Sequence, residues 1–202
     1  MLNGNYLHQA WAAVPLVPMV VFSAVFMLMM SLENYIKVRD RGRANAEQDA
    51  GSLKRIRIIS GFVFFGGLAL AVFPIVGVPG GRAFHFYFGA ALVLAGFLLR
   101  AWAVGKLGAY FTGTVMTHAG QRIITDGPYR YVRHPAYTGA LLFYAGWGMA
   151  TGSLVGLIVV VAMIAYAFHR RIQVEEQVMI AAFGEEYSSY MKKTRRLVPG
   201  IY

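Results

Sequence analysis

The longest stretch of the chain without a charged side chain covers residues 135–168, and its length restricts the possible folds. A single transmembrane helix needs about 20 apolar residues. The stretch is therefore too long for one span and suits two short membrane helices. Small residues gather near its middle, so we expect the turn between the two helices near Gly152 and Ser153.

Three further apolar runs, at residues 14–32, 58–78 and 83–99, raise the predicted number of membrane helices to five. The composition agrees, because 57% of the residues are hydrophobic and 14% are charged, whereas a soluble domain carries about 25% charged residues. The sequence thus predicts an all-α, polytopic membrane bundle. We expect the last two helices to tilt, or the final one to continue past Phe168 with Arg170 reaching the interface.

Basic residues are distributed unequally between the segments that connect these runs. Residues 33–57, 100–134 and 169–202 contain all nine acidic residues and every lysine and arginine except Arg82. Because cytoplasmic segments carry the excess of basic residues, we predict an outer N-terminus and a cytoplasmic C-terminus. Any reaction is then expected at the cytoplasmic face of a cell inner membrane. The net charge of +10 has the same explanation, so no nucleic-acid partner is expected.

We expect residues 1–202 to form a single membrane domain with two parts. Residues 1–100 would hold the first three transmembrane helices and a cytoplasmic loop. Residues 101–202 would form the catalytic region, with a long cofactor-binding loop over 101–134, the helical hairpin, and a helix over 169–193 that emerges into the cytoplasm. A loop of that length in a small bundle is usually functional.

Common signatures of other functions are absent from the sequence. It contains no cysteine, no G-x-G-x-x-G loop after a strand and no H-E-x-x-H pair. The five histidines lack the spacing of metal ligands, so we expect no metal site. No charged residue lies deep in an apolar run, which argues against an ion pathway.

The densest polar and aromatic segment is residues 125–137, T-D-G-P-Y-R-Y-V-R-H-P-A-Y. Pro135 suits the first turn of a helix, and the preceding His134 is excluded from helical geometry. The result is a helix N-terminus at the cytoplasmic face, which attracts an anionic group. A purely structural interpretation also fits, with tyrosines in the aromatic belt and arginines that set the topology.

A second cluster follows the uncharged stretch, at residues 170–176 and 183–187. Arg171 and Glu175 are four residues apart, so they share one face of the expected helix just below the membrane. An ordinary ion pair on a solvated helix face explains the same spacing.

Taken together, these motifs resemble the isoprenylcysteine carboxyl methyltransferase family. The resemblance rests on R-H-P-x-Y-x-G at 133–139, the uncharged hairpin, R-x-x-x-E-E at 171–176 and F-G-E-E-Y at 183–187. Q-R-I-I-T-x-G-P-Y at 121–129 is also similar to that family, and the likeness starts near Arg100. Phospholipid N-methyltransferases share much of the pattern.

The resemblance implies an integral membrane methyltransferase that uses S-adenosylmethionine without a Rossmann fold. Catalytic roles would fall to Arg133, Arg171 and Glu175, with Arg171 facing the carboxylate of the acceptor. The residues that would surround the cofactor are Gln121, Arg122, Ile123, Ile124, Tyr129, His134, Pro135, Ala136, Tyr137 and Glu175.

The resemblance allows two kinds of lipid as the acceptor of the methyl group. A prenyl-cysteine or similar lipid-linked carboxylate is already ionised at pH 7 and needs an orienting cation such as Arg171. A phospholipid amine must lose a proton, so it needs a base, for which Glu175, Glu176 or His134 would serve. Arg171 favours the acid. Two other interpretations are a non-enzymatic membrane subunit and a sterol-type reductase.

Overall fold

A computed structural model describes residues 81–202 except 114, 116, 118, 119 and 151. Before residue 81 it describes only short helical pieces, at residues 24, 25, 27–29, 31, 35, 54–56, 58–62 and 66. The predicted spans at 14–32 and 58–78 therefore lie largely outside the described residues. The count of five spans and the orientation of the termini remain predictions.

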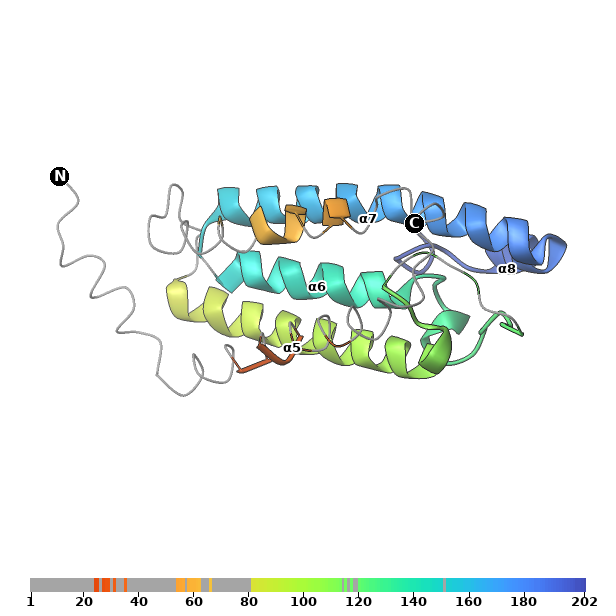
Figure 1. The fold of residues 1–202 in the computed structure, drawn as a ribbon. Helices are drawn as coiled ribbons and strands as arrows, with labels where there is room; N and C mark the ends of the chain where they lie inside the picture. The colour runs from red at the N-terminus through yellow and green to blue at the C-terminus, as the bar shows by residue number, and fades with distance from the viewer. Residues whose placement is uncertain are drawn as a thin grey trace.

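The described part is helical, as expected, and Figure 1 shows its long helices lying side by side. One isolated parallel bridge joins Val132 to Arg195. The helices are α5 (Arg82–Leu107), η1 (Gly108–Tyr110), η2 (Gly127–Arg130), α6 (Pro135–Ala150), α7 (Leu154–Phe183) and α8 (Glu185–Lys193).

The predicted helical hairpin is confirmed by α6 and α7. Pro135 opens α6, where its missing N–H costs nothing. The turn uses Gly152 at φ 69°, and Ser153 caps α7 by accepting a hydrogen bond from the Gly156 N–H at 3.1 Å. The helix α7 then continues well past Phe168, which was one of the two expected ways for it to gain length.

Two predicted boundaries are wrong. The helix α5 does not end at 99 but runs to Leu107, where Gly108 stops it with a φ of 53°, and the short helix η1 follows before the loop begins. The expected single helix over 169–193 is divided into α7 and α8 at Gly184, also at φ 53°. In both places a glycine adopts a left-handed conformation that ends the hydrogen-bond ladder.

Two of the helices are long and apolar enough to cross a bilayer, over Ala83–Tyr110 and Leu154–Phe183. At 30 residues, α7 is about 45 Å long, whereas the hydrocarbon core is about 30 Å thick. Its last turns therefore extend beyond the apolar layer. These two helices fit an integral membrane protein. The charged residues of α7 all follow Phe168, so we predict that they lie at the edge of the bilayer or outside it.

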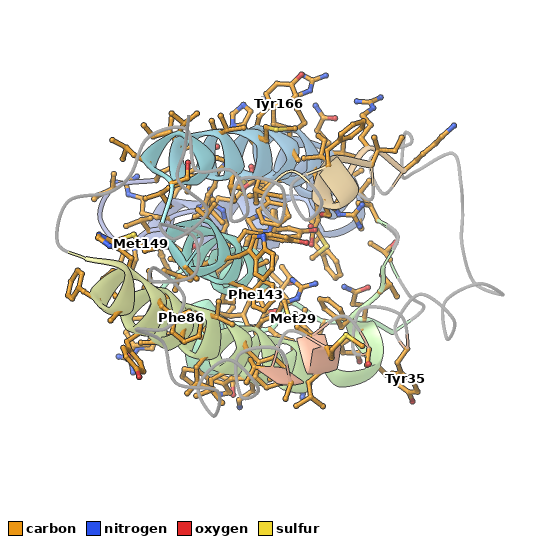
Figure 2. The ribbon with its side chains drawn as sticks, turned by 90° about the vertical axis from the view of Figure 1, so that its left-hand side faces the viewer. Met29, Tyr35, Phe86, Phe143, Met149 and Tyr166 are labelled. Atoms are coloured by element: carbon orange, nitrogen blue, oxygen red, sulfur yellow. The ribbon has the colours of Figure 1, made fainter. Side chains whose placement is uncertain are left out.

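The helices α5 and α6 approach each other closely through facing glycines. A Cβ atom added at Gly139 would lie 2.6 Å from the Gly96 carbonyl oxygen and 2.7 Å from the Arg100 nitrogen. Small residues let backbones approach in this way inside membranes. Beside this contact, Phe143 and Phe86 lie in the core together with Met29 from the N-terminal part (Figure 2).

Candidate active site

A pocket opens where the end of α5, the start of α6 and the charged part of α7 meet, and α8 forms one of its sides. Its cavity volume is about 100 Å³, below the range of about 300–1,000 Å³ that is common for small-molecule sites. The pocket is therefore narrow in this structure, and the chemistry of its lining, not its volume, makes it a candidate site.

Almost all of the site residues predicted from the sequence line this pocket. Pro135 does not, because it is fully buried in the first turn of α6. The predicted residues that line the pocket are Gln121, Arg122, Ile123, Ile124, Tyr129, Arg133, His134, Ala136, Tyr137, Arg171 and Glu175.

The Tyr137 hydroxyl links the two residues of α7 that were expected to form a pair. The Arg171 Nε–H donates to Tyr137 Oη at 2.8 Å, and the Tyr137 O–H donates to Glu175 Oε2 at 2.8 Å. Arg171 also donates through Nη2 to the carbonyl oxygen of Gly113 at 2.6 Å. Its guanidinium is therefore held in one plane beside the pocket by partners on α6 and on the loop.

Glu175 presents its carboxylate to the pocket. Its side chain is 33% exposed, and Oε2 lies 3.9 Å from His134 Nδ1. Among the described residues, no hydrogen bond is made to Glu175 Oε1. The carboxylate therefore keeps one oxygen available for a donor group that enters the pocket.

The neighbouring Glu176 has a different environment, because consecutive residues of a helix point to different sides. It is buried and accepts from Arg133 Nε at 2.9 Å and from Arg196 Nη2 at 2.7 Å. Arg133 Nη1 also donates to the carbonyl oxygens of Met191, at 3.0 Å, and of Thr194. Arg133 borders the pocket, but its hydrogen bonds join α7 to the C-terminal segment.

The C-terminal segment fixes the chain just before α6. The Arg133 N–H donates to the Arg195 carbonyl oxygen at 2.7 Å, and the His134 N–H donates to that of Arg196 at 3.0 Å. Thr138 Oγ1 donates to the Leu197 carbonyl oxygen at 2.8 Å. These contacts hold the His134 side chain against α7, where Nε2 lies 3.4 Å from Glu176 Oε1.

Buried tyrosines from η2 and α8 form another side of the pocket. Burial raises the pKa of Tyr190 to about 12 and that of Tyr129 further. Both phenols are therefore neutral at physiological pH. The Tyr190 O–H donates to the Tyr129 carbonyl oxygen at 2.7 Å, which fastens α8 to η2.

An ion pair joins the two ends of the loop between α5 and η2. Lys106 forms an exposed ion pair with Asp126, and its hydrogen bond holds the pKa of that carboxyl below the ordinary 3.8. A Cβ atom added at Gly127, which has a φ of 59°, would lie 3.0 Å from Lys106 Cε, so the stem of Lys106 passes close to this glycine. Ile123 and Ile124 are in this way kept over the pocket.

Several lining residues were not predicted from the sequence. Val178 and Met179 follow Glu175 by three and four residues, so helical spacing from Glu175 would have found them. Tyr187 and Tyr190 line the pocket from α8. No periodic signal marks the others, which are Leu107, Tyr110, Phe111, Thr112 and Val115.

Comparison with known proteins gives one family and several relatives. A model of the phospholipid methyltransferase family matches residues 84–186, about half of the chain. The protein-S-isoprenylcysteine O-methyltransferase of Schizosaccharomyces pombe is 32% identical over 109 residues, which cover 47% of this chain and 46% of the relative. A probable enzyme of the same name from Oryza sativa subsp. indica is 31% identical over 117 residues, covering 57% of this chain and 61% of the relative.

The fold has a solved counterpart. The structure of the eukaryotic intramembrane Ras methyltransferase, an isoprenylcysteine carboxyl methyltransferase, superimposes with a TM-score of 0.61 at 17% identity, over 91% of this chain and 68% of the other. The chain spans about half to three fifths of the length of the two curated relatives named above. The resemblance inferred from the motifs is confirmed: this chain belongs to the phospholipid methyltransferase family, together with the isoprenylcysteine carboxyl methyltransferases.

Proposed function

We propose that the protein is a membrane methyltransferase that uses S-adenosylmethionine to methylate the carboxylate of a prenyl-cysteine or a similar lipid-linked acid. The observation that carries the proposal is the Arg171–Tyr137–Glu175 arrangement inside the pocket. It places a fixed guanidinium beside a partly exposed carboxylate. We further propose that this pocket faces the cytoplasm. Its lining comes from segments rich in basic residues, and such segments lie on the cytoplasmic side of a membrane.

The pocket has the mixed chemistry that an adenosylated amino acid requires. S-adenosylmethionine supplies a methyl group on a sulfonium cation, in a molecule that also carries an adenine, a ribose and an amino-acid end. Ile123 and Ile124 offer an apolar surface for the base, and Glu175 offers an acceptor for an ammonium or ribose hydroxyl. Tyr129 and Tyr137 present aromatic rings, which attract cations.

Arg171 suits an acceptor that is already an anion. A carboxylate is ionised at pH 7, so the site needs to orient it and not to deprotonate it. The planar guanidinium binds both oxygens of a carboxylate, a geometry that lysine cannot reproduce. Tyr137 and Gly113 hold the plane of that guanidinium in place, and positioning of this kind lowers the barrier of a displacement reaction.

The test combines binding with product chemistry. The purified protein in detergent is titrated with S-adenosylhomocysteine in a calorimeter, and then incubated with labelled methyl donor and either N-acetyl-S-farnesyl-cysteine or phosphatidylethanolamine. We expect binding at one site per chain and a base-labile, volatile label from the prenyl-cysteine. Absence of binding would remove the enzymatic proposal.

A second candidate is methylation of a phospholipid amine. It is favoured by the description of the matching family model and by the partly exposed carboxylate of Glu175, which can accept a proton. In the same assay this activity would give a base-stable label in the lipid headgroup. Arg171 argues against it, because a guanidinium repels an ammonium acceptor.

A further inference from the structure

The C-terminal segment, residues 194–202, runs back from α8 to the middle of α7. Tyr202 Oη lies 2.6 Å from His169 Nδ1 and accepts a hydrogen bond from Arg196 Nη1 at 3.2 Å. The Arg196 guanidinium also lies over the Tyr202 ring, 5.5 Å from its centre. Figure 1 marks the end of the segment beside α7. These contacts fix the level of the segment along that helix.

That level is the predicted edge of the bilayer. His169 follows directly on the uncharged stretch 135–168, in a helix long enough to cross a membrane. We therefore expect the lipid headgroups at His169, and Tyr202 is at the same level. Tyr166, three residues earlier on the same face, is 64% exposed at the outer side of α7 (Figure 2). Tyrosines of this kind concentrate at membrane interfaces.

Residues 197–202 form a turn that closes on itself. The N–H groups of Leu197 and Val198 donate to the Tyr202 carbonyl oxygen at 2.6 and 2.7 Å. The N–H groups of Ile201 and Tyr202 donate to the Val198 carbonyl oxygen at 3.1 and 3.2 Å. Backbone polar groups away from water need partners within the protein. The turn supplies several of these partners itself, so it can leave water at a low cost.

The turn has a buried side and an exposed apolar side. Leu197 is buried in the core that includes Phe168 and Ile172. Ile201 is 81% exposed, and Val198 and Tyr202 are exposed beside it. An exposed group of apolar side chains indicates an interaction surface. Because this group lies at the headgroup level, on the face of α7 that carries an exposed tyrosine, the partner that fits it is the lipid of the surrounding bilayer.

We propose that Val198, Ile201 and Tyr202 insert into the headgroup and upper acyl region of the bilayer, as an interfacial anchor for the C-terminal segment. Apolar and aromatic side chains that follow basic residues are typical of segments that lie in a membrane interface. From the sequence alone, residues 169–202 were expected to lie in the cytoplasm, so the return to the bilayer comes from the tertiary structure.

The anchor is connected to the candidate active site. The Arg133 and His134 N–H groups donate to the carbonyl oxygens of Arg195 and Arg196, just before the turn. His134 lines the pocket. A segment held by the bilayer therefore also holds the start of α6. The proposal concerns lipid contact alone and does not depend on the methyl-transfer activity.

The experiment measures how deeply the turn enters the lipid. The chain contains no cysteine, so a nitroxide label can be placed at Ile201→Cys alone. Ile158→Cys, exposed on the apolar part of α7, is the lipid reference, and Glu186→Cys, exposed on α8, is the water reference. The full chain is reconstituted into liposomes of dioleoyl phosphatidylcholine and dioleoyl phosphatidylglycerol. Power saturation then compares collisions with oxygen, which concentrates in lipid, and with a water-soluble nickel chelate.

We expect the ratio of oxygen to nickel collisions at Ile201→Cys to lie several-fold above that at Glu186→Cys and below that at Ile158→Cys. A label at Val198→Cys should give a similar value. In that background Ile201→Glu should lower the ratio towards the water reference, because a charged side chain leaves the interface, whereas Ile201→Leu should retain it. Ser189→Glu adds the same charge on exposed α8 and should change nothing. Thermal unfolding of every variant separates a folding defect from a change in depth.

Three results would overturn the proposal. A ratio at Ile201→Cys equal to that at Glu186→Cys would mean that the turn faces water. Protection of the label from both reagents would mean that protein covers it, either another part of this chain or a second copy. An equal effect of Ser189→Glu and Ile201→Glu would show that overall charge sets the ratio. None of these readouts requires turnover, so failure here leaves the proposed methyltransferase activity standing.

Discussion

Arg171 Nε lies 2.8 Å from the hydroxyl oxygen of Tyr137, although 34 residues separate them in the chain. The same hydroxyl donates to Glu175. One oxygen thus fixes a cation and an anion on α7 from the first turn of α6. This contact therefore joins the motif at residues 133–139 to the motif at residues 171–176, which are far apart in the sequence.

Replacing Tyr137 with phenylalanine removes this oxygen and keeps the ring. Hydrogen bonds to charged groups contribute about 1.5–3 kcal/mol, so kcat/KM should fall about 10- to 100-fold. The measurement is transfer of labelled methyl to N-acetyl-S-farnesyl-cysteine. Tyr131→Phe is the matched control, because Tyr131 is 60% exposed and lies outside the pocket. A wild-type rate for Tyr137→Phe would refute the role of the hydroxyl.

Arg171→Lys keeps the charge but loses the fork of the guanidinium. One ammonium, which also reaches less far than a guanidinium, does not reproduce the two bonds to Tyr137 and Gly113. We expect turnover to fall about a hundredfold, in a protein that still folds. Arg130→Lys, at an exposed position in η2, should behave as wild type. Equal rates in both variants would show that charge alone is sufficient.

Glu175→Gln tests the carboxylate that faces the pocket. If Glu175 receives an ammonium or hydroxyl of the donor, its neutralisation should weaken S-adenosylhomocysteine binding by about tenfold or more. Isothermal calorimetry provides the dissociation constant. Glu186→Gln, exposed on α8, serves as control. Unchanged affinity together with lost turnover would instead place Glu175 at the acceptor.

Arg133→Ala tests the connection between α7 and the C-terminal segment. It leaves buried Glu176 with Arg196 and frees the carbonyl groups of Met191 and Thr194. Removing one partner of a buried pair costs about 3 kcal/mol. We expect a lower unfolding temperature and faster proteolysis after residue 193. Arg195→Ala, which removes an exposed side chain, should change neither.

Gly139→Ala tests the close crossing of α5 and α6. The new methyl group would meet backbone atoms of Gly96 and Arg100, which have no room to rotate away. Overpacking of this kind costs about 1–3 kcal/mol. The measurement is thermal unfolding in detergent. Gly105→Ala on α5 meets nothing within 4 Å, so it should be neutral or stabilising. Destabilisation by both would point to a general effect of alanine.

Helix positions followed from the sequence where hydropathy changes sharply. Pro135 and Gly152 mark the two ends of α6 because one lacks an N–H and the other adopts a positive φ. The end of α5 was missed, because hydropathy falls at Arg100 while the backbone stays helical to Leu107. A change in polarity does not end a helix. The end of α5 is marked instead by Gly108.

The candidate residues of the site followed from motifs, but their separate roles did not. Glu175 and Glu176 are adjacent and chemically identical, and a resemblance to a family does not show what each one touches here. The structure turns Glu175 to the pocket and Glu176 to Arg133 and Arg196. The two carboxylates have different surroundings because the orientation of α7 about its axis turns one toward the pocket and the other toward the C-terminal segment.

The sequence by itself determined that the chain enters a membrane and where the hairpin of α6 and α7 turns, because these depend on local hydropathy and backbone preference. Only the tertiary structure decided which charges meet. Tyr137 reaches Arg171, and Arg133 reaches Glu176 and the residues beyond α8, across tens of positions in the chain. Such pairings depend on how α6 packs against α7, which local sequence does not encode.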